Sequence, residues 1–252
     1  MTAPPAILTS GLEKRFGETA AVDGLDLEIP RGLFYGLLGP NGAGKSTTVS
    51  MLTGTRRPTR GTIHIEGKPL DPDDPAFKAA IGVVPEEPPL FERLRGDEQL
   101  VFTGRMYGLG APEASRRATD LLELLGLSSQ GHTLVVDYSR GMRKKLAIGC
   151  ALIHAPRLLF FDEPFEGVDA VSAVTIQRVL ESLTSRGSTV LLTTHILEVA
   201  ERICDRVGII HQGKLVCELD PASLAGEGTT LTDVFRRVVG ADAAPPALPE
   251  WL

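Results

Sequence analysis

The first third of the chain has the alternation of apolar and polar side chains that is typical of β-strands. Residues 22–29 alternate in this way, which predicts a strand with one buried face. Residues 33–38 form a nearly unbroken apolar run, which predicts a strand buried on both faces of a sheet. Shorter strands are predicted at 6–9, 61–66 and 81–84. The chain therefore begins with β-structure, which includes an N-terminal antiparallel region.

Between about residues 88 and 156 the spacing of apolar side chains becomes helical. They recur at Leu100, Val101 and Tyr107, and again at residues 121–125. We therefore predict a helical sub-domain inserted over about 88–156.

Strand patterns return in the last third of the chain. Buried strands are predicted at 158–161 and 189–192, with a helix over 171–185 between them and a hairpin over 207–217. Buried strands that are separated by helices predict an α/β core with a mostly parallel sheet.

Length and composition are those of a globular protein. The 252 residues are 42% hydrophobic and 23% charged. We expect one domain over residues 1–241, followed by a loose tail over 242–252. The net charge of −6 argues against a partner that is bound by general attraction to a basic surface, so we expect no nucleic acid partner.

The sequence shows no feature of a secreted or membrane-spanning chain. The N-terminus lacks the basic and apolar regions of a signal peptide, and no 18 apolar residues follow one another without a charge. Cys150, Cys204 and Cys217 lie far apart, so we expect small buried thiols in a reducing compartment. We therefore expect a cytoplasmic protein.

A glycine-rich segment between the strand at 33–38 and a helix predicted at 45–52 matches the pattern G-x-x-x-x-G-K-[ST]. Its glycines let consecutive N–H groups point at phosphate oxygens, and the helix N-terminus adds a partial positive charge. The ammonium group of Lys45 would bring a full positive charge to the β and γ phosphates, and the Ser46 hydroxyl would ligate Mg²⁺. The pattern predicts a P-loop NTPase core. The expected nucleotide contacts of the loop are Gly39, Pro40, Asn41, Gly42, Ala43, Gly44, Lys45, Ser46 and Thr47.

Two carboxylates follow the predicted strand at 158–161, at a point that lies beside the phosphate loop in a doubly wound sheet. Asp162 is expected to hold Mg²⁺, directly or through water. Glu163 is expected to orient and partly deprotonate the attacking water, a contribution of about 10²–10⁴-fold. The pair therefore predicts hydrolysis of the nucleotide.

The order of these motifs resembles that of the ATP-binding subunit of ATP-binding cassette (ABC) transporters. Residues 138–142, Tyr-Ser-Arg-Gly-Met, stand where that family has its signature Leu-Ser-Gly-Gly-Gln. Residues 166–169, Glu-Gly-Val-Asp, resemble its D-loop, and His195 resembles its switch histidine. Phe16 stands where the family has an aromatic residue that stacks on adenine. The resemblance covers about residues 6–218 and implies ATP and Mg²⁺ as cofactors.

The resemblance also implies how these residues act. Two chains would pair head to tail around two ATP molecules, and the second chain would be another copy or a homologous subunit. Ser139 and Gly141 of one chain would face the γ-phosphate held by the other, and Asp169 in the D-loop is likewise expected to contact ATP. His195 would sense the γ-phosphate and act in hydrolysis together with Glu163.

Three features depart from the family's pattern or extend it. Glu86 stands where the family usually has a glutamine; its charge would ligate Mg²⁺, and without the metal would repel Asp162 and Glu163. Arg140, within the signature, either adds charge beside the phosphate or is solvated. Residues 143–145, Arg-Lys-Lys, are expected to form the exposed face of the signature helix, with contact to the dimer partner as the alternative.

These features predict an ATPase subunit that energises a separate transmembrane permease. The Tyr-Ser-x-Gly-Met form of the signature resembles drug- and antibiotic-exporter cassettes, which favours export. The chain would lie on the inner face of the cell membrane, with its segment at about 88–156 against the permease. The alternative is a soluble cassette ATPase that acts on the ribosome or DNA. Such relatives usually carry two cassettes or long coiled coils, and this sequence has neither.

Overall fold

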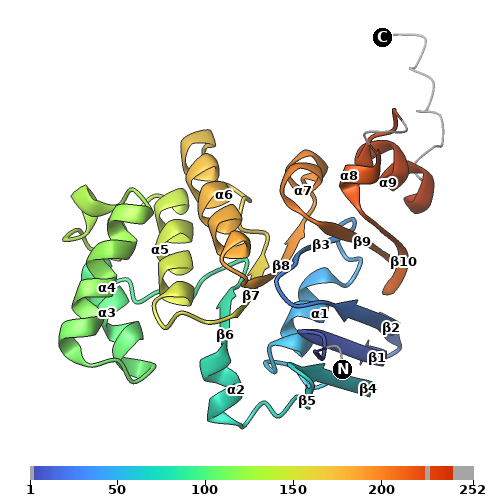
Figure 1. Cartoon of the computed structure of the whole chain (residues 1–252), viewed down its shortest axis with the longest axis horizontal. Coiled ribbons are helices and arrows are strands. Elements are labelled where there is room, and N and C mark those ends of the chain that lie inside the picture. Colours follow the sequence, from blue (N-terminus) through green and yellow to red (C-terminus); the bar gives the residue numbers. More distant parts are fainter. Residues whose placement is uncertain (1–2, 225–227, 241–252) are drawn as a thin grey trace.

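The computed structural model describes residues 3–224 and 228–240, which form two sheets with helices around them (Figure 1). The strands are β1 Ile7–Phe16, β2 Thr19–Ile29, β3 Phe34–Leu38, β4 Arg60–Ile65, β5 Lys68–Pro69, β6 Ile81–Val84, β7 Leu158–Asp162, β8 Thr189–Thr194, β9 Arg206–His211 and β10 Lys214–Leu219. The α-helices are α1 Lys45–Leu52, α2 Pro75–Ala80, α3 Gly96–Met106, α4 Ala111–Leu124, α5 Arg140–Leu152, α6 Ala170–Ser185, α7 Leu197–Ile203, α8 Pro221–Leu224 and α9 Leu231–Val239. Short 3₁₀ turns lie at Ser128–Gln130 and Val135–Asp137.

The larger sheet carries the strands that lead into the site. Its strand order is β10-β9-β3-β8-β7-β6, and all neighbours are parallel except β10, which forms a hairpin with β9. Leu38 pairs with Thr194, and Asp162 pairs with Thr193. The carboxyl ends of β3, β7 and β8 therefore lie side by side at one edge.

The unbroken apolar runs arise because each strand faces two different cores. Phe34 and Phe161 point to a core shared with α5, α6 and α7. Tyr35 and Phe160 point to a second core shared with α1 and the antiparallel sheet β2-β1-β4-β5. Alternate residues of a strand point to opposite faces, so a strand between two cores is apolar at every position. The predicted α/β class with a mostly parallel sheet and an N-terminal antiparallel region is confirmed.

Helices α3, α4 and α5 occupy the segment in which a helical sub-domain is expected, and α3 and α4 lie at the end of the molecule farthest from β1 and β2 (Figure 1). The interior of this helical segment contains the buried side chains Leu100, Leu122, Leu125 and Ile148. The tail expected over 242–252 lies outside the described residues. Among the described helices, none has the length and the apolar character that crossing a bilayer requires.

Two expectations from the sequence are wrong. The first strand continues to Phe16 instead of ending at Thr9, because it pairs with β2 and β4 across irregularities that shift the register after Thr9 and Ser10. The basic run after the signature is not an exposed face. Lys144 is 2% exposed and Lys145 8%, because α5 is covered by α3, α6 and β6.

Candidate functional site

The phosphate loop lies between β3 and α1, and its glycines stand where a side chain would not fit. A Cβ on Gly39 would lie 2.3 Å from the carbonyl oxygen of Ile210. Gly44 has a φ of +109°, and a Cβ on it would lie 2.4 Å from the carbonyl oxygen of Ala21. The loop is thus wedged between β9 and β2, and glycine alone allows both the close approach and the left-handed turn.

Lys45 is the first residue of α1 and is 6% exposed. Its Nζ donates hydrogen bonds to the carbonyl oxygens of Gly39 (2.8 Å) and Pro40 (3.4 Å). The same ammonium lies 3.5 Å from Glu163 Oε1. The loop therefore curls around a buried positive charge.

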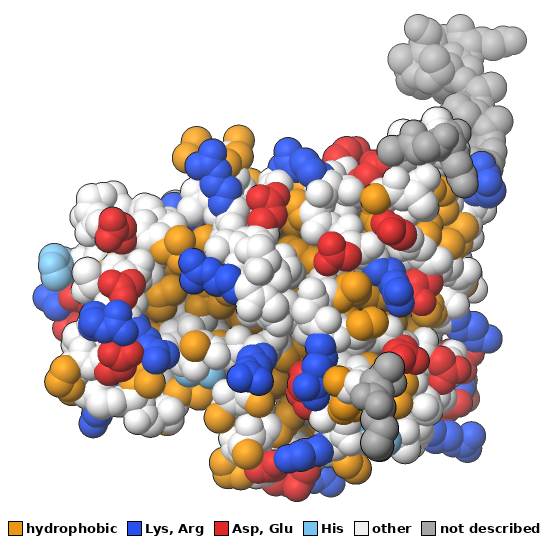
Figure 2. Space-filling model, in the orientation of Figure 1, with side chains coloured by type: hydrophobic (Ala, Val, Ile, Leu, Met, Phe, Trp, Pro, Cys, Tyr) orange, Lys and Arg blue, Asp and Glu red, His pale blue; other side chains and the backbone are white. Residues whose placement is uncertain are grey.

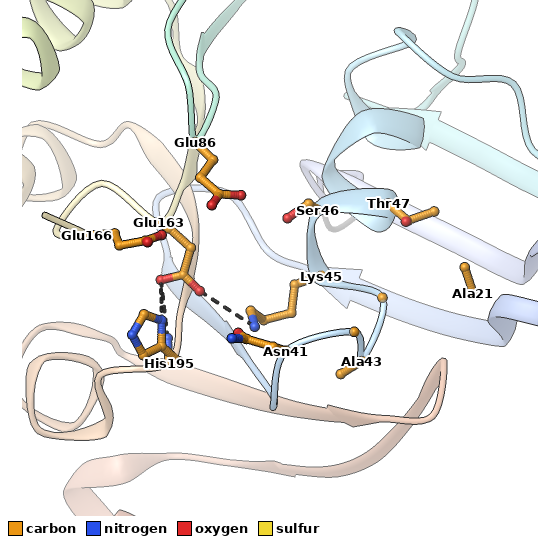
Figure 3. A pocket seen from close by; sticks show the side chains of 12 residues that line it. Ala21, Asn41, Ala43, Lys45, Ser46, Thr47, Glu86, Glu163, Glu166 and His195 are labelled. Carbon is orange, nitrogen blue, oxygen red and sulfur yellow. Dashed lines mark hydrogen bonds and ion pairs between the residues drawn. The ribbon is translucent and has the colours of Figure 1, made fainter.

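The loop opens into a pocket of about 520 Å³ (Figure 3). The pocket is lined by Ala21, Asn41, Gly42, Ala43, Gly44, Lys45, Ser46, Thr47, Glu86, Glu163, Glu166 and His195. Main-chain N–H groups of a glycine-rich turn, a helix N-terminus and a lysine ammonium all favour an anion here. The carboxylates stand on the opposite wall, so the pocket suits an anion that arrives with a cation.

Asp162 ends β7 directly beside the loop and is 6% exposed. Its Oδ1 accepts a hydrogen bond from Ser46 Oγ (3.2 Å) and another from the Thr193 hydroxyl. A carboxylate and a hydroxyl oxygen are ligands that Mg²⁺ takes in proteins, usually together with phosphate oxygens and water. Within the described residues no group of three His, Cys, Asp or Glu side chains could hold a metal alone. Ser46 and Asp162 therefore fit a Mg²⁺ that a nucleotide helps to ligate.

Glu163 follows Asp162 and is also 6% exposed. His195 Nδ1 lies 3.0 Å from Glu163 Oε2, and the His195 main-chain N–H donates to the same oxygen (3.3 Å). Lys45 approaches the other carboxylate oxygen, so the glutamate is held between two basic groups (Figure 3). The predicted catalytic residues Glu163, His195 and Lys45 thus meet in one place.

Glu86 also points into the pocket, from the segment that follows β6 (Figure 3). Its pKa is raised, first by burial of the carboxyl and then by the negative charges of Glu166 and Asp162. The carboxylates that act on it are therefore Glu166 and Asp162, rather than the expected pair of Asp162 and Glu163. A bound divalent cation would relieve this repulsion.

The other residues expected to contact ATP do not line this pocket. Ser139 is the N-cap of α5, where its Oγ accepts from the Met142 N–H (3.2 Å). Asp169 is the N-cap of α6, and its Oδ1 accepts from the Ser172 N–H (2.9 Å). A Cβ on Gly141 would lie 2.9 Å from Asp169 Oδ2, so the two helix starts touch. Ser139 and Asp169 are thus exposed at two adjoining helix starts outside the pocket, with Gly141 buried between them.

Phe16 likewise lies apart from the pocket lining and is 45% exposed. The Arg56 guanidinium lies 4.9 Å from the centre of its ring. Lys14 Nζ also lies 5.7 Å from the ring centre, so Phe16 stands outside the core in contact with two cations.

The Arg140 side chain is 59% exposed, which agrees with the solvated alternative left open from the sequence. Its guanidinium lies 3.6 Å from Glu166 Oε1. It also covers Gly167, where a Cβ would lie 2.4 Å from the guanidinium carbon. The arginine therefore joins the signature to the segment after Glu163 within the same chain.

Besides Ala21, which lines the pocket, sequence reasoning missed three residues at the site. Thr193 contacts Asp162 and the Glu163 main chain, Glu166 lines the pocket, and Lys144 lies behind it. The position of Thr193 at the end of a buried strand is a signal that could have indicated it. Nothing local marks Lys144, whose neighbours are 19 and 58 residues away.

Comparison with known proteins agrees with this geometry. A family model described as ABC transporter matches residues 22–166. The daunorubicin resistance ATP-binding protein DrrA3 of Streptomyces coeruleorubidus is 39% identical over 98% of this chain and 78% of its own length. The Nod factor export ATP-binding protein I of Cupriavidus metallidurans is 41% identical over 84% of this chain and 70% of its own length.

A solved structure described as the ATP-binding subunit of an ABC transporter is similar throughout. Its TM-score is 0.84 at 30% identity, over 92% of this chain and 99% of that one. The chain spans 64% to 78% of the length of the curated relatives it matches, and less than two thirds of some of them. With the family model, the relatives and the fold in agreement, the chain belongs to the ABC transporter family and carries its ATP-binding cassette.

Proposed function

We propose that this chain binds ATP with Mg²⁺ and hydrolyses the ATP to energise a separate transmembrane permease, for export. The observation that carries the proposal is the meeting of the phosphate loop, Lys45, Glu163 and His195 in one pocket. Each group is of the type that phosphoryl transfer requires: an anion cradle, a cation, an acceptor for the water proton and a group near the γ-phosphate.

The roles of the residues follow from their positions. Lys45 and the main chain of residues 39–47 would hold the phosphates, while Ser46, Asp162 and Glu86 would hold Mg²⁺. Mg²⁺, when bound, supplies neutralisation of phosphate charge. Glu163 would orient the attacking water and accept its proton.

Glu163→Gln tests the catalytic role directly. The amide keeps the shape of the side chain and cannot accept the proton, so we expect ATP turnover to fall by about 10²-fold or more. ATP binding should be retained. Glu123→Gln, an exposed glutamate next to the end of α4, is the matched control and should turn over ATP like the parent. Undiminished turnover in Glu163→Gln would contradict the assignment.

We further propose that two cassettes pair head to tail, so that the helix starts that carry Ser139, Gly141 and Asp169 meet the ATP of the partner. The position of these residues outside their own pocket supports this arrangement. Adding ATP and Mg²⁺ to the slowly hydrolysing Glu163→Gln variant should double its mass in light scattering. Ser139→Arg in the same background should stay monomeric, because the arginine would occupy the space of the partner's phosphate.

An apolar groove beside the pocket supports contact with a permease. The groove, about 380 Å³, lies between the segment after β6, α3 and α5. Phe91, Phe102 and Met106 line it and are 55%, 41% and 71% exposed. Side chains of this kind fit an apolar helix of another protein. Met106→Asp should abolish co-purification of a membrane protein and leave ATP binding unchanged.

Export is supported by the signature and by the relatives, which are named for drug resistance and Nod factor export. The experiment uses inside-out vesicles that contain the chain and its permease, with ATP and a candidate substrate added to the medium. ATP-dependent uptake of the substrate into these vesicles corresponds to export from cells. Uptake by right-side-out vesicles instead would show import.

The alternative, an ATPase acting on the ribosome or DNA, has less support. On the face drawn in Figure 2, Lys and Arg side chains are interspersed with Asp and Glu and do not form one basic patch. The net charge is −6. Affinity capture of the tagged chain from gently solubilised membranes distinguishes the two, because a polytopic membrane protein or ribosomal proteins would accompany it.

A further inference from the structure

A buried cation lies directly behind the pocket, on the first turns of α5. Lys144 is 2% exposed, and its Nζ donates to the main-chain carbonyl oxygens of Glu86 (2.5 Å) and Glu163 (3.1 Å). An ammonium group has three N–H donors and is costly to bury unless they are used. The ammonium group of Lys144 is therefore bound to the main chain at Glu86 and at Glu163.

The bond to Glu163 acts on a backbone that is itself unusual. Glu163 has a φ of +46°, in the left-handed region that residues with a Cβ seldom adopt. Its N–H donates to the carbonyl and hydroxyl oxygens of Thr193, each at 3.1 Å, and its carbonyl accepts from Lys144. The residue is thus held by β8 on one side and α5 on the other. In this conformation its carboxylate reaches both Lys45 and His195.

The bond to Glu86 brings in a third segment. Glu86 lies on the pocket wall, and the segment after it lines the apolar groove. Lys144 belongs to the helix that Ser139 caps. One ammonium group therefore connects the wall of the nucleotide pocket, the exit of β7 and the start of the signature helix.

We propose that Lys144 is a positioning residue for hydrolysis, which holds Glu163 in its working conformation and ties it to Glu86 and the signature helix. The inference rests on the proposed role of Glu163 as the group that orients the attacking water. Lys144 itself does not reach the pocket, so it acts through Glu163 and leaves the phosphate cradle intact.

The test compares Lys144→Met with Lys145→Met in the full chain. Methionine keeps the buried stem and removes the ammonium, so we expect Lys144→Met to lower kcat at least about tenfold with less than about a threefold change in the Kd for ATP. Lys145 lies next to it on α5 and is also buried, yet within the described residues its side chain makes no hydrogen bond or ion pair. Lys145→Met should keep kcat within about twofold of the parent.

A double-mutant cycle separates positioning from general damage to the fold. If Lys144 acts through Glu163, adding Lys144→Met to Glu163→Gln should change the residual single-turnover rate by less than about twofold. The proposal would be overturned if Lys144→Met lowered the rate of Glu163→Gln by as large a factor as it lowers the rate of the parent. An unchanged kcat in Lys144→Met alone would also overturn it. If Lys144→Met does not fold, Lys144→Leu, which also removes every N–H donor, is judged by the same cycle.

The two proposals fail in different ways. Full turnover in Glu163→Gln would contradict the role of Glu163 itself. Loss of turnover in Glu163→Gln, with parental turnover in Lys144→Met, would leave that role standing and refute the positioning role of Lys144.

Discussion

At the scale of single residues, the site depends on backbone positions that few side chains can occupy. Glu163 adopts a left-handed φ, a conformation that costs about 1–3 kcal/mol for a residue with a Cβ. Hydrogen bonds from Lys144 and to Thr193 hold it there. Gly39 and Gly44 let the loop approach neighbouring carbonyl oxygens where any Cβ would collide. Local strain of this kind persists because the surrounding structure fixes it.

Gly39→Ala should damage the phosphate loop. Its Cβ would lie 2.3 Å from the Ile210 carbonyl oxygen, so the loop must move away from β9. We expect ATP affinity to fall about tenfold or more, which corresponds to about 1.4 kcal/mol. The control is Gly110→Ala, where the nearest atom to a Cβ is 4.0 Å away. Equilibrium binding of a fluorescent ATP analogue to both variants gives the comparison, and equal affinities would contradict the steric argument.

The raised pKa of Glu86 has a consequence for stability in the absence of nucleotide and metal. A raised pKa means that protonation favours the folded state. This contribution is complete below the ordinary pKa of 4.5 and is lost as the pH rises through the raised pKa. Glu86→Gln cannot ionise, so its thermal midpoint should exceed that of the parent at neutral pH and match it at pH 4. If the thermal midpoints of Glu86→Gln and the parent differed by the same amount from pH 4 to neutral pH, Glu86 would not titrate in this way.

At the scale of elements, the signature helix α5 is the connection between the two halves of the site. Its N-cap Ser139 is exposed near Asp169, and its buried Lys144 contacts the main chain behind the pocket. The helix packs against α3, α6 and β6. One helix therefore carries both the exposed cap and the group that hydrogen-bonds the Glu163 main chain.

Two substitutions of Ser139 separate capping from contact with ATP. Ser139→Ala removes the acceptor for the Met142 N–H and should lower the free energy of unfolding by about 1 kcal/mol. Ser139→Asp keeps the cap, so its stability should match the parent. The added negative charge would face the partner's γ-phosphate, however, and ATP turnover should be lost. If Ser139→Asp turns over ATP normally, the signature does not meet a phosphate.

At the scale of the whole molecule, the fold gathers negative charge from separate segments into one place. Glu86, Glu163 and Glu166 line the pocket, and Asp162 lies beside Ser46. An ATP molecule without a cation adds to this charge, while Mg²⁺ offsets it. Ligand that binds the folded state at 100 times its Kd stabilises it by about 2.7 kcal/mol.

Removal of the metal should therefore reduce the effect of ATP on stability. We expect a clear rise in the thermal midpoint with ATP and Mg²⁺, and a much smaller rise with ATP and EDTA. In Glu86→Gln the rise in thermal midpoint should differ less between ATP with Mg²⁺ and ATP with EDTA, because one carboxylate that repels ATP is removed. Exposed Glu123→Gln should leave this difference unchanged. Equal shifts with and without Mg²⁺ in the parent would contradict the metal's place at Ser46 and Asp162.

Much of the fold could be predicted from the sequence because it depends on contiguous residues. The loop pattern, the helix Lys45–Leu52 and the strand Ile81–Val84 were each readable from local spacing, and the structure has them at those positions. The α/β class follows from apolar runs that face two cores. Helices α2, α7 and α8 have few turns in which a pattern can repeat. Helix α9, in contrast, has apolar residues at helical spacing (Leu231, Val234, Phe235, Val238 and Val239), and this signal could have predicted it.

The sequence by itself thus determined the chemistry: a phosphate loop, two carboxylates after a strand and a histidine, in an order that indicates the family. Only the tertiary structure decided which of these groups meet. Strand register put Asp162 beside Thr193 and brought Glu163 to His195. Packing of α5 buried Lys144, which its basic neighbours had suggested would be exposed. The physical reason is that burial and long-range pairing depend on segments far apart along the chain, which local spacing does not record.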